Sequence, residues 1–262
     1  MIGLLLLAMR AGLARQQPLA GVQATLNDYI EGTAIGQPDR LRQAFHPDFN
    51  LFLVASDTLR VIDGQGYISR VEPGKAYNRV AKIVSVDVEN DAAAAKIEVY
   101  FPDQQRRATD YLLLLKTSQR WQIIHKVIHL NTFSNAETLQ VNNPDELPAI
   151  RQALYDYMDG TAHSKPQPLA RAFRPDFNLY YIKSGAVTVI NGQQYLNNFN
   201  EGKSYNRIGK ILSVDFEGDA ALAKLQILMP DRDRIAIDYL LLLKLNGQWK
   251  IVHKSFTTKQ YQ

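Results

Sequence analysis

The chain has 262 residues, of which 46% are hydrophobic and 21% are charged, with a net charge of +4 and no cysteine. This length and apolar content suffice for one large or two ordinary hydrophobic cores, and they argue against extensive disorder. The lack of cysteine excludes disulfides, thiol nucleophiles and thiolate metal sites. The basic residues are dispersed among acidic ones, which argues against a nucleic-acid partner.

The N-terminus begins with the apolar run Met1–Met9. Such a run is too short to span a bilayer as a helix, which takes about 20 residues. It is similar to the hydrophobic region of a secretory signal, with small residues following at Ala11–Ala14. We therefore expect residues 1–20 to be a signal peptide or a disordered N-terminus, and the protein to be periplasmic or secreted without a membrane span. Because no basic residue precedes the run and Arg10 follows it, a frayed apolar N-terminus is the alternative.

The remaining sequence is a repeat of domain size. Tyr29 recurs as Tyr157, and the same shift (157 − 29 = 128) aligns Gln23–Lys126 with the second half without a gap. Roughly half of the aligned positions are identical, which identifies a duplicated domain. We expect a first domain at 21–131, a linker rich in Asn, Ser and Thr at 132–143, and a second domain at 144–262.

In each repeat the expected helices precede most of the strands. The patterns of the first repeat predict helices near 22–33, 39–45 and 64–71, and strands at 49–54, 59–62, 78–89 and 92–101. In the second repeat the first helix is expected to begin near Pro144–Leu147. This order indicates an α+β fold rather than a parallel α/β sheet.

Each repeat ends in two apolar runs that we interpret as a hairpin of strands buried on both faces. In the second repeat Asn246-Gly247 separates the runs, and this dipeptide favours a two-residue turn. Such a turn places Lys244 opposite Trp249. If the pairing continues without interruption, Leu240 lies opposite His253.

An uninterrupted register brings an acid and a histidine together on one face of the sheet. Asp238 and His253 become diagonal neighbours, and we expect the same of Asp110 and His125 in the first repeat. A carboxylate beside an imidazole raises the pKa of the histidine and makes it a candidate general base. A buried polar pair that serves only the fold is the alternative interpretation.

Three groups of residues carry a resemblance to a known superfamily. They are Tyr29-x-x-Gly32, the segment Ala44–Asp48, and the Asp110-Tyr111 strand with Trp121-x-Ile123-x-His125-Lys126. These motifs resemble the NTF2-like superfamily, and more closely its SnoaL-like and putative lumazine-binding branch. The resemblance implies a cone of three helices against a curved antiparallel sheet in each repeat. It also implies that the two cones pack as an internal pseudo-dimer, with higher homo-oligomers left open.

In this superfamily the functional site is an apolar cavity between helices and sheet, so the resemblance implies a small-molecule ligand. The first repeat offers as lining candidates Tyr29, Phe45, Phe49, Tyr67, Tyr77, Asp110, Trp121 and His125. Their counterparts in the second repeat are Tyr157, Phe173, Phe177, Tyr195, Tyr205, Asp238, Trp249 and His253. Aromatic walls with a few polar groups suit a flat, largely apolar ligand. The alternative is that most of these aromatic residues belong to the core.

Three functions agree with this sequence. The first is binding of a small hydrophobic or aromatic molecule without established catalysis, and the second is a structural or interaction scaffold. The third is an isomerase or hydratase of the SnoaL-like kind that uses Asp110, His125 and Tyr29. A steroid-isomerase-like arrangement, in which Tyr29 and Asp110 form an oxyanion hole, would need Asp57 as its base, but Gly185 replaces Asp57 in the second repeat.

Two further patterns bear on ligands. The motif Gly74-Lys75-x-Tyr77-Asn78-Arg79 recurs at 202–207, and its cations are candidates to receive an anionic ligand or to close a pocket mouth. A solvated turn, or a contact between the repeats, is the alternative. His125 and His129 would lie about 13 Å apart on a strand and cannot share a metal ion, so we expect no metal site. We also expect no cofactor.

Overall fold

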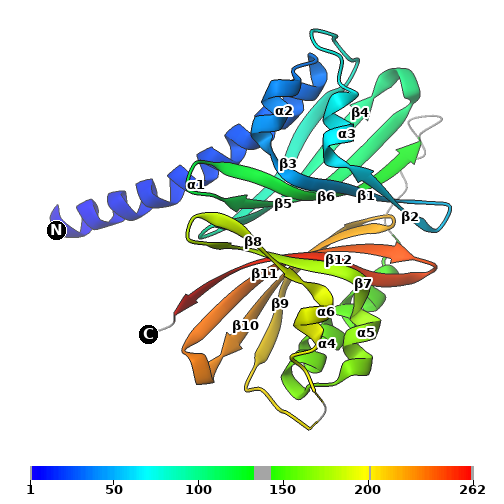
Figure 1. Cartoon of the computed structure of the whole chain (residues 1–262). Helices are drawn as coiled ribbons and strands as arrows, with labels where there is room; N and C mark the ends of the chain where they lie inside the picture. The colour runs from blue at the N-terminus through cyan, green and yellow to red at the C-terminus, as the bar shows by residue number, and fades with distance from the viewer. Residues whose placement is uncertain (1, 133–142, 201, 261–262) are drawn as a thin grey trace.

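The computed structural model describes the backbone of residues 2–132, 143–200 and 202–260, and the side chains of the N-terminal helix from Pro18 onward. Two units of the same architecture face each other (Figure 1). The expected linker at 132–143 lies almost wholly outside the described residues. So do the side chains of residues 1–17, on which the export prediction depends. No helix in the described part of the chain has both the length and the apolar character needed to cross a membrane.

The first unit confirms the predicted α+β order. Its helices are α1 (Ile2–Ala34), α2 (Pro38–Ala44) and α3 (Gly64–Ser69). Its strands are β1 (Phe45–Ala55), β2 (Thr58–Asp63), β3 (Val80–Glu89), β4 (Ala92–Phe101), β5 (Arg106–Lys116) and β6 (Trp121–Thr132), with the 3₁₀ turn η1 (Pro102–Gln104) before β5.

The second unit repeats this order. Its helices are α4 (Glu146–His163), α5 (Pro166–Ala172) and α6 (Gly192–Leu196). Its strands are β7 (Phe173–Lys183), β8 (Ala186–Asn191), β9 (Ile208–Glu217), β10 (Ala220–Met229), β11 (Arg234–Leu245) and β12 (Gln248–Gln260), with the 3₁₀ turn η2 (Pro230–Arg232) before β11.

Each unit contains one mixed, six-stranded sheet. The strand orders are β2-β1-β6-β5-β4-β3 and β8-β7-β12-β11-β10-β9. Neighbouring strands are antiparallel except that β1 runs parallel to β6 and β7 runs parallel to β12. The parallel pair places the strand that follows the second helix beside the last strand of its unit.

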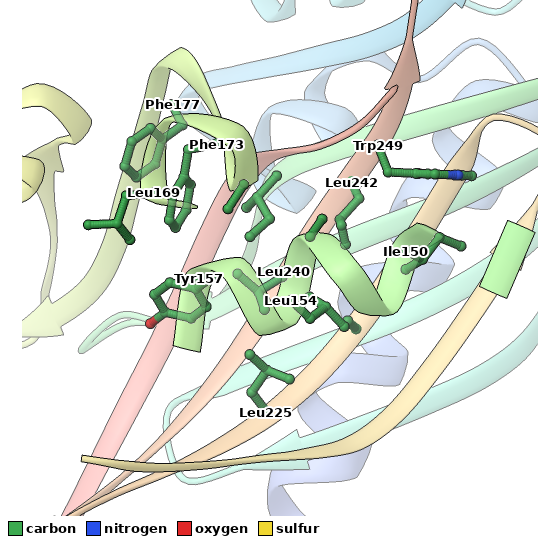
Figure 2. Packing of buried hydrophobic residues seen from close by; sticks show 14 of the residues in the cluster. Ile150, Leu154, Tyr157, Leu169, Phe173, Phe177, Leu225, Leu240, Leu242 and Trp249 are labelled. Atoms are coloured by element: carbon green, nitrogen blue, oxygen red, sulfur yellow. The ribbon is translucent and has the colours of Figure 1, made fainter. Parts of the chain in front are cut away.

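The helices cover the outer face of each sheet and enclose a core (Figures 1 and 2). In α4 the buried residues Ile150, Leu154 and Tyr157 recur at helical spacing and face the sheet. They pack with Leu240 and Leu242 of β11, as Figure 2 shows. Burying each such side chain contributes about 1.5–3 kcal/mol, so this packing holds the helix against the sheet.

The inner faces of the two sheets pack against each other. Leu241 and Leu243 join Leu113 and Leu115 in this interface, whereas the alternate leucines of the same strands face the cores. Side chains alternate along a strand, which explains why the four-leucine runs are apolar throughout. The prediction of strands buried on both faces is thereby confirmed.

The interface is pseudo-symmetric. The Lys96 ammonium lies 2.7 Å from Asp215 of the other unit, and the equivalent Lys224 lies 2.6 Å from Asp87. The hydroxyl groups of Tyr111 and Tyr239 donate hydrogen bonds to the same two carboxylates. Two equal patches contact each other as in a two-fold dimer, so the chain forms the expected internal pseudo-dimer.

Candidate functional site

An irregularity in the last hairpin decides which side chains enter each cone. In the second unit the predicted pairing of Lys244 with Trp249 is confirmed. Further along, the register slips by one residue at a β-bulge, so Leu240 pairs with Lys254 and not with His253. The first unit has the same slip. An extra residue reverses the face of every later side chain, and the register predicted beyond this point is wrong.

His125, the predicted catalytic histidine, and its counterpart His253 consequently lie between the sheets. His125 and His253 stack with ring centroids 3.5 Å apart and an interplanar angle of 6°. They are 1% and 3% exposed. Burial lowers the pKa of His125 to about 3 and also places the pKa of His253 well below its ordinary value. Neither ring forms a hydrogen bond with Asp110 or Asp238 in the structure described, so the predicted Asp–His pair is wrong in both units.

In place of histidine, a lysine and a tyrosine meet the aspartate. In the second unit the Tyr157 hydroxyl donates to Asp238 Oδ2 at 2.7 Å, and Lys254 Nζ lies 2.8 Å from the same oxygen. The lysine also donates to the tyrosine hydroxyl oxygen. We call this group the Tyr–Asp–Lys trio.

The first unit holds an equivalent trio. Tyr29 donates to Asp110 Oδ2 at 2.6 Å, and Lys126 Nζ lies 3.0 Å from that oxygen and 2.8 Å from the tyrosine hydroxyl. The tyrosine and the aspartate are joined as the steroid-isomerase-like arrangement implied. However, the tyrosine hydroxyl donates its hydrogen bond to the carboxylate. The two side chains therefore do not both offer a hydrogen-bond donor to a ligand. Asp57, the base of that hypothesis, is exposed at the tip of the β1–β2 turn with a φ of 59°, and its assignment is wrong.

Each trio is buried and balanced in charge. The side chain of Asp238 is fully buried and that of Lys254 is 6% exposed. A buried carboxylate is tolerated when a cation and a hydrogen-bond donor accompany it. Burial, and next the Asp238 charge, raise the pKa of Tyr157 well above its ordinary value, so its hydroxyl stays protonated and donates.

A cavity of about 160 Å³ adjoins the trio of the second unit. Tyr157, Asp238 and Lys254 form its buried end. The apolar wall consists of Leu179, Ile190, Tyr195, Ile227, Met229, Ala236 and Phe256. At its outer end lie the exposed residues Arg232, Arg234 and Thr258, and the half-buried Arg207 also lines the cavity.

The structure brings only some of the predicted residues to this cavity. Tyr157, Tyr195 and Asp238 line it. Phe173 and Phe177 instead stack at 4.0 Å within the core, as Figure 2 shows.

The other two aromatic candidates of the second unit have structural contacts. Trp249 is buried in the core and donates its indole N–H to Glu146 at 2.8 Å. Tyr205 donates to the Asn198 carbonyl at 2.9 Å. Neither lines the cavity described here.

The first unit places its candidates in the same way. Phe45 and Phe49 stack at 4.0 Å in its core, where Trp121 is also buried. Tyr67 packs against that core with its ring 5.5 Å from Lys126 Nζ. The Tyr77 hydroxyl accepts a hydrogen bond from the Glu72 amide in an exposed loop.

Lys254 was not predicted as a site residue because the bulge, not the local pattern, turns it into the cone. Arg207 was available from the sequence as the last residue of the repeated motif at 202–207, and its position at the cavity agrees with a place at a pocket mouth. Arg232 and Arg234 flank the end of η2, and no motif marked them. Aligning the repeats would have singled out Arg232, since Gln104 occupies its position in the first unit.

Known protein families, curated proteins and solved structures include proteins similar to this chain. The chain belongs to the NTF2-like family described as putative lumazine-binding, whose model matches residues 17–129 and again residues 145–257. An NTF2-like protein of unknown function from Shewanella baltica is 20% identical, with a TM-score of 0.42, covering 47% of this chain and 100% of that one. Another, from Silicibacter pomeroyi, is also 20% identical, with a TM-score of 0.40, and covers 45% and 98%. Among curated proteins, aldolase FrzH from Cladobotryum sp is 26% identical over 116 residues, which are 41% of this chain and 87% of that protein.

Proposed function

We propose that the chain binds a small molecule of single-ring size in the cavity of the second unit, with a polar atom of the ligand at the trio. The observation that carries this proposal is an apolar wall that ends on the prearranged group of Tyr157, Asp238 and Lys254. Apolar walls with a few fixed polar groups are typical of small-molecule sites.

The volume limits the size of the ligand. Drug-sized ligands occupy cavities of about 300–1,000 Å³, whereas an engineered cavity of about 150 Å³ holds one benzene molecule. The cavity measures about 160 Å³. We therefore expect one ring to be enclosed. A two-ring pteridine such as lumazine would extend past the outer end.

The buried end provides a place for a hydrogen-bond donor. Asp238 uses Oδ2 for both of its partners, and its buried Oδ1 accepts no hydrogen bond from the described residues. A buried acceptor without a partner costs about 1–3 kcal/mol. A ligand N–H or O–H that reaches Oδ1 would recover this free energy, so we expect a donor on the ring.

Thermal denaturation and calorimetry with the full chain test this proposal. Phenol, aniline, benzoate and lumazine serve as probes, and a compound at 100 times its Kd should raise the free energy of unfolding by about 2.7 kcal/mol. Lys254→Met should abolish the effect, while the matched variant Lys126→Met in the first unit should retain it. If no single-ring compound raises Tm, the binding proposal fails and a scaffold becomes the better interpretation.

A second candidate is carbon–carbon lyase chemistry of the aldol type. Two observations favour it: the similarity to an aldolase, and a buried lysine beside a carboxylate with one unpaired oxygen. Asp238 would take the proton from a hydroxyl of the substrate, the carbon–carbon bond would break, and Lys254 would stabilise the enolate oxygen that forms.

Turnover of a β-hydroxy ketone that carries one aromatic ring tests this candidate. Asp238→Asn should abolish cleavage, and Asp110→Asn should leave it unchanged. Borohydride treatment during turnover should give no covalent adduct, because the lysine acts here through its charge. Binding of ketones without any turnover would exclude the candidate.

A further inference from the structure

We propose that the ligand of the second cavity carries an anionic group, a carboxylate or a phosphate ester, that the three arginines lining this cavity receive. This inference rests on the proposed function, since it names the chemical class of the molecule bound at that site.

The cavity has an excess of positive charge. Arg207, Arg232, Arg234 and Lys254 line it, against the single carboxylate of Asp238. That carboxylate already has Lys254 as its counterion at 2.8 Å. The three guanidinium groups therefore have no counterion among the residues that line the cavity.

No carboxylate in the described part of the chain forms an ion pair with these three arginines. The nearest acids in sequence are Asp231 and Asp233, on either side of Arg232. Asp231 instead accepts a hydrogen bond from the Asn206 amide at 3.0 Å. Asp233 adopts a left-handed backbone conformation with φ 45° at the end of η2.

Aromatic rings hold Arg207 in place without neutralising it. Its guanidinium carbon lies 5.2 Å from the ring centroid of Phe199 and 5.5 Å from that of Tyr205. Cation–π contacts of this kind orient the planar group and leave its N–H donors available. A guanidinium fixed in this way suits a carboxylate or phosphate, which it binds through two parallel hydrogen bonds.

The two units differ at this position. The first unit has Arg79 and Arg106 where the second has Arg207 and Arg234, but Gln104 replaces Arg232. The second unit thus has one more cation at its outer end than the equivalent positions of the first, and we assign the anion preference to the second unit.

Calorimetry of the full chain with matched single-ring probes tests the inference. Benzoate and phenyl phosphate should bind at least about tenfold more tightly than methyl benzoate, which is neutral and likewise has no hydrogen-bond donor, because each anion gains charge-assisted hydrogen bonds. This difference should shrink as sodium chloride is raised, since salt screens exposed charges. The better of the two anions identifies the carboxylate or the phosphate ester as the natural group.

Two variants distinguish the contribution of the arginines to the affinity from that of the rest of the cavity. Arg232→Gln, which introduces the residue of the first unit, should lower the affinity for benzoate several-fold and leave that for methyl benzoate unchanged. Arg106→Gln in the first unit is the matched control and should change neither affinity.

Three results would overturn the inference. Methyl benzoate binding as tightly as benzoate would refute the anionic group and leave the proposed small-molecule site intact. Inorganic phosphate binding as tightly as phenyl phosphate would mean that the ring adds nothing, so the site would be one for free anions. Failure of all probes to bind would refute the inference and the proposed function together.

Discussion

At the scale of single residues, the trio shows how a carboxylate, an ammonium and a phenol are accommodated in a cone. Asp238 and Lys254 neutralise each other, and Tyr157 donates to the shared carboxylate oxygen. An ion pair of this kind gives little net stability when intact, but removing one member leaves the other charge buried.

A double-mutant cycle on the ion pair tests this account. Asp238→Asn and Lys254→Met should each lower the free energy of unfolding by about 3–5 kcal/mol, because each leaves an uncompensated charge. The double variant should cost clearly less than the sum of the two. Urea denaturation provides the measurement, and strictly additive losses would show that the pair is not coupled.

The stacked histidines make stability depend on pH. The pKa of His125 is about 3 in the folded chain, below that of an unfolded histidine near 6.5, and burial depresses the pKa of His253 as well. At a pH between the folded and the unfolded pKa of a histidine, the unfolded state binds more protons than the folded state. The contribution of the pair is therefore complete above about pH 6.5 and is lost as the pH falls, by up to about 1.4 kcal/mol per pH unit for each histidine.

The double variant His125→Phe/His253→Phe should keep an aromatic stack and lose this proton linkage. Between pH 6.5 and 5 its free energy of unfolding should fall by less than that of the parent. The difference between the two falls should be up to about 2 kcal/mol per histidine. Urea denaturation at three pH values compares the two proteins. Parallel pH profiles would show that the histidines do not titrate on unfolding.

At the scale of elements, the sequence predicted most of the framework. Period-2 and period-3.6 patterns located the helices and strands, and Asn246-Gly247 fixed the turn-side register of the last hairpin. The bulge was not predictable from the local pattern, because Val252 and His253 continue an apolar strand without any turn residue. That one extra residue moved His253 into the interface and Lys254 into the cone.

The contact between α1 and the last hairpin of the first unit gives a second test. Gly21 approaches Trp121 so closely that an added Cβ would lie 2.7 Å from the indole Cδ1. An exposed helical Gly→Ala change gains up to about 1 kcal/mol, whereas overpacking costs about 1–3 kcal/mol. We therefore expect Gly21→Ala to lower Tm.

The second unit provides the matched control for this helix contact. Ala149 occupies the equivalent position there, and Ala149→Gly should cost only about 1 kcal/mol through helix propensity. A rise in Tm for Gly21→Ala would show that the indole can move aside.

At the scale of the whole molecule, duplication has made a dimer within one chain. The same surface of each unit forms the interface. Lys96 pairs with Asp215 of the other unit, and the equivalent Lys224 pairs with Asp87. Every member of these pairs therefore has an equivalent in both units. A single unit carries the complementary residues for a copy of itself.

Residues 144–262 expressed alone should accordingly form a homodimer. Lys224 and Asp215 would pair across the new two-fold axis, and the apolar inner face would be covered again. Light scattering after size-exclusion chromatography measures the mass. Asp215→Lys, which opposes Lys224 with a like charge, should prevent assembly. A stable monomer of the parent segment at micromolar concentration would contradict the expectation.

The sequence by itself determined the repeat, the α+β class and the strands buried on both faces, because these depend on patterns that recur along the chain. The pseudo-dimer was implied by the family resemblance. Tertiary structure decided the chemistry. Whether His253 or Lys254 joins Asp238 depends on a one-residue slip between strands, and whether three arginines meet depends on how η2 and the segment before β9 approach β11. Residues far apart in sequence set both arrangements, so no local pattern contains them.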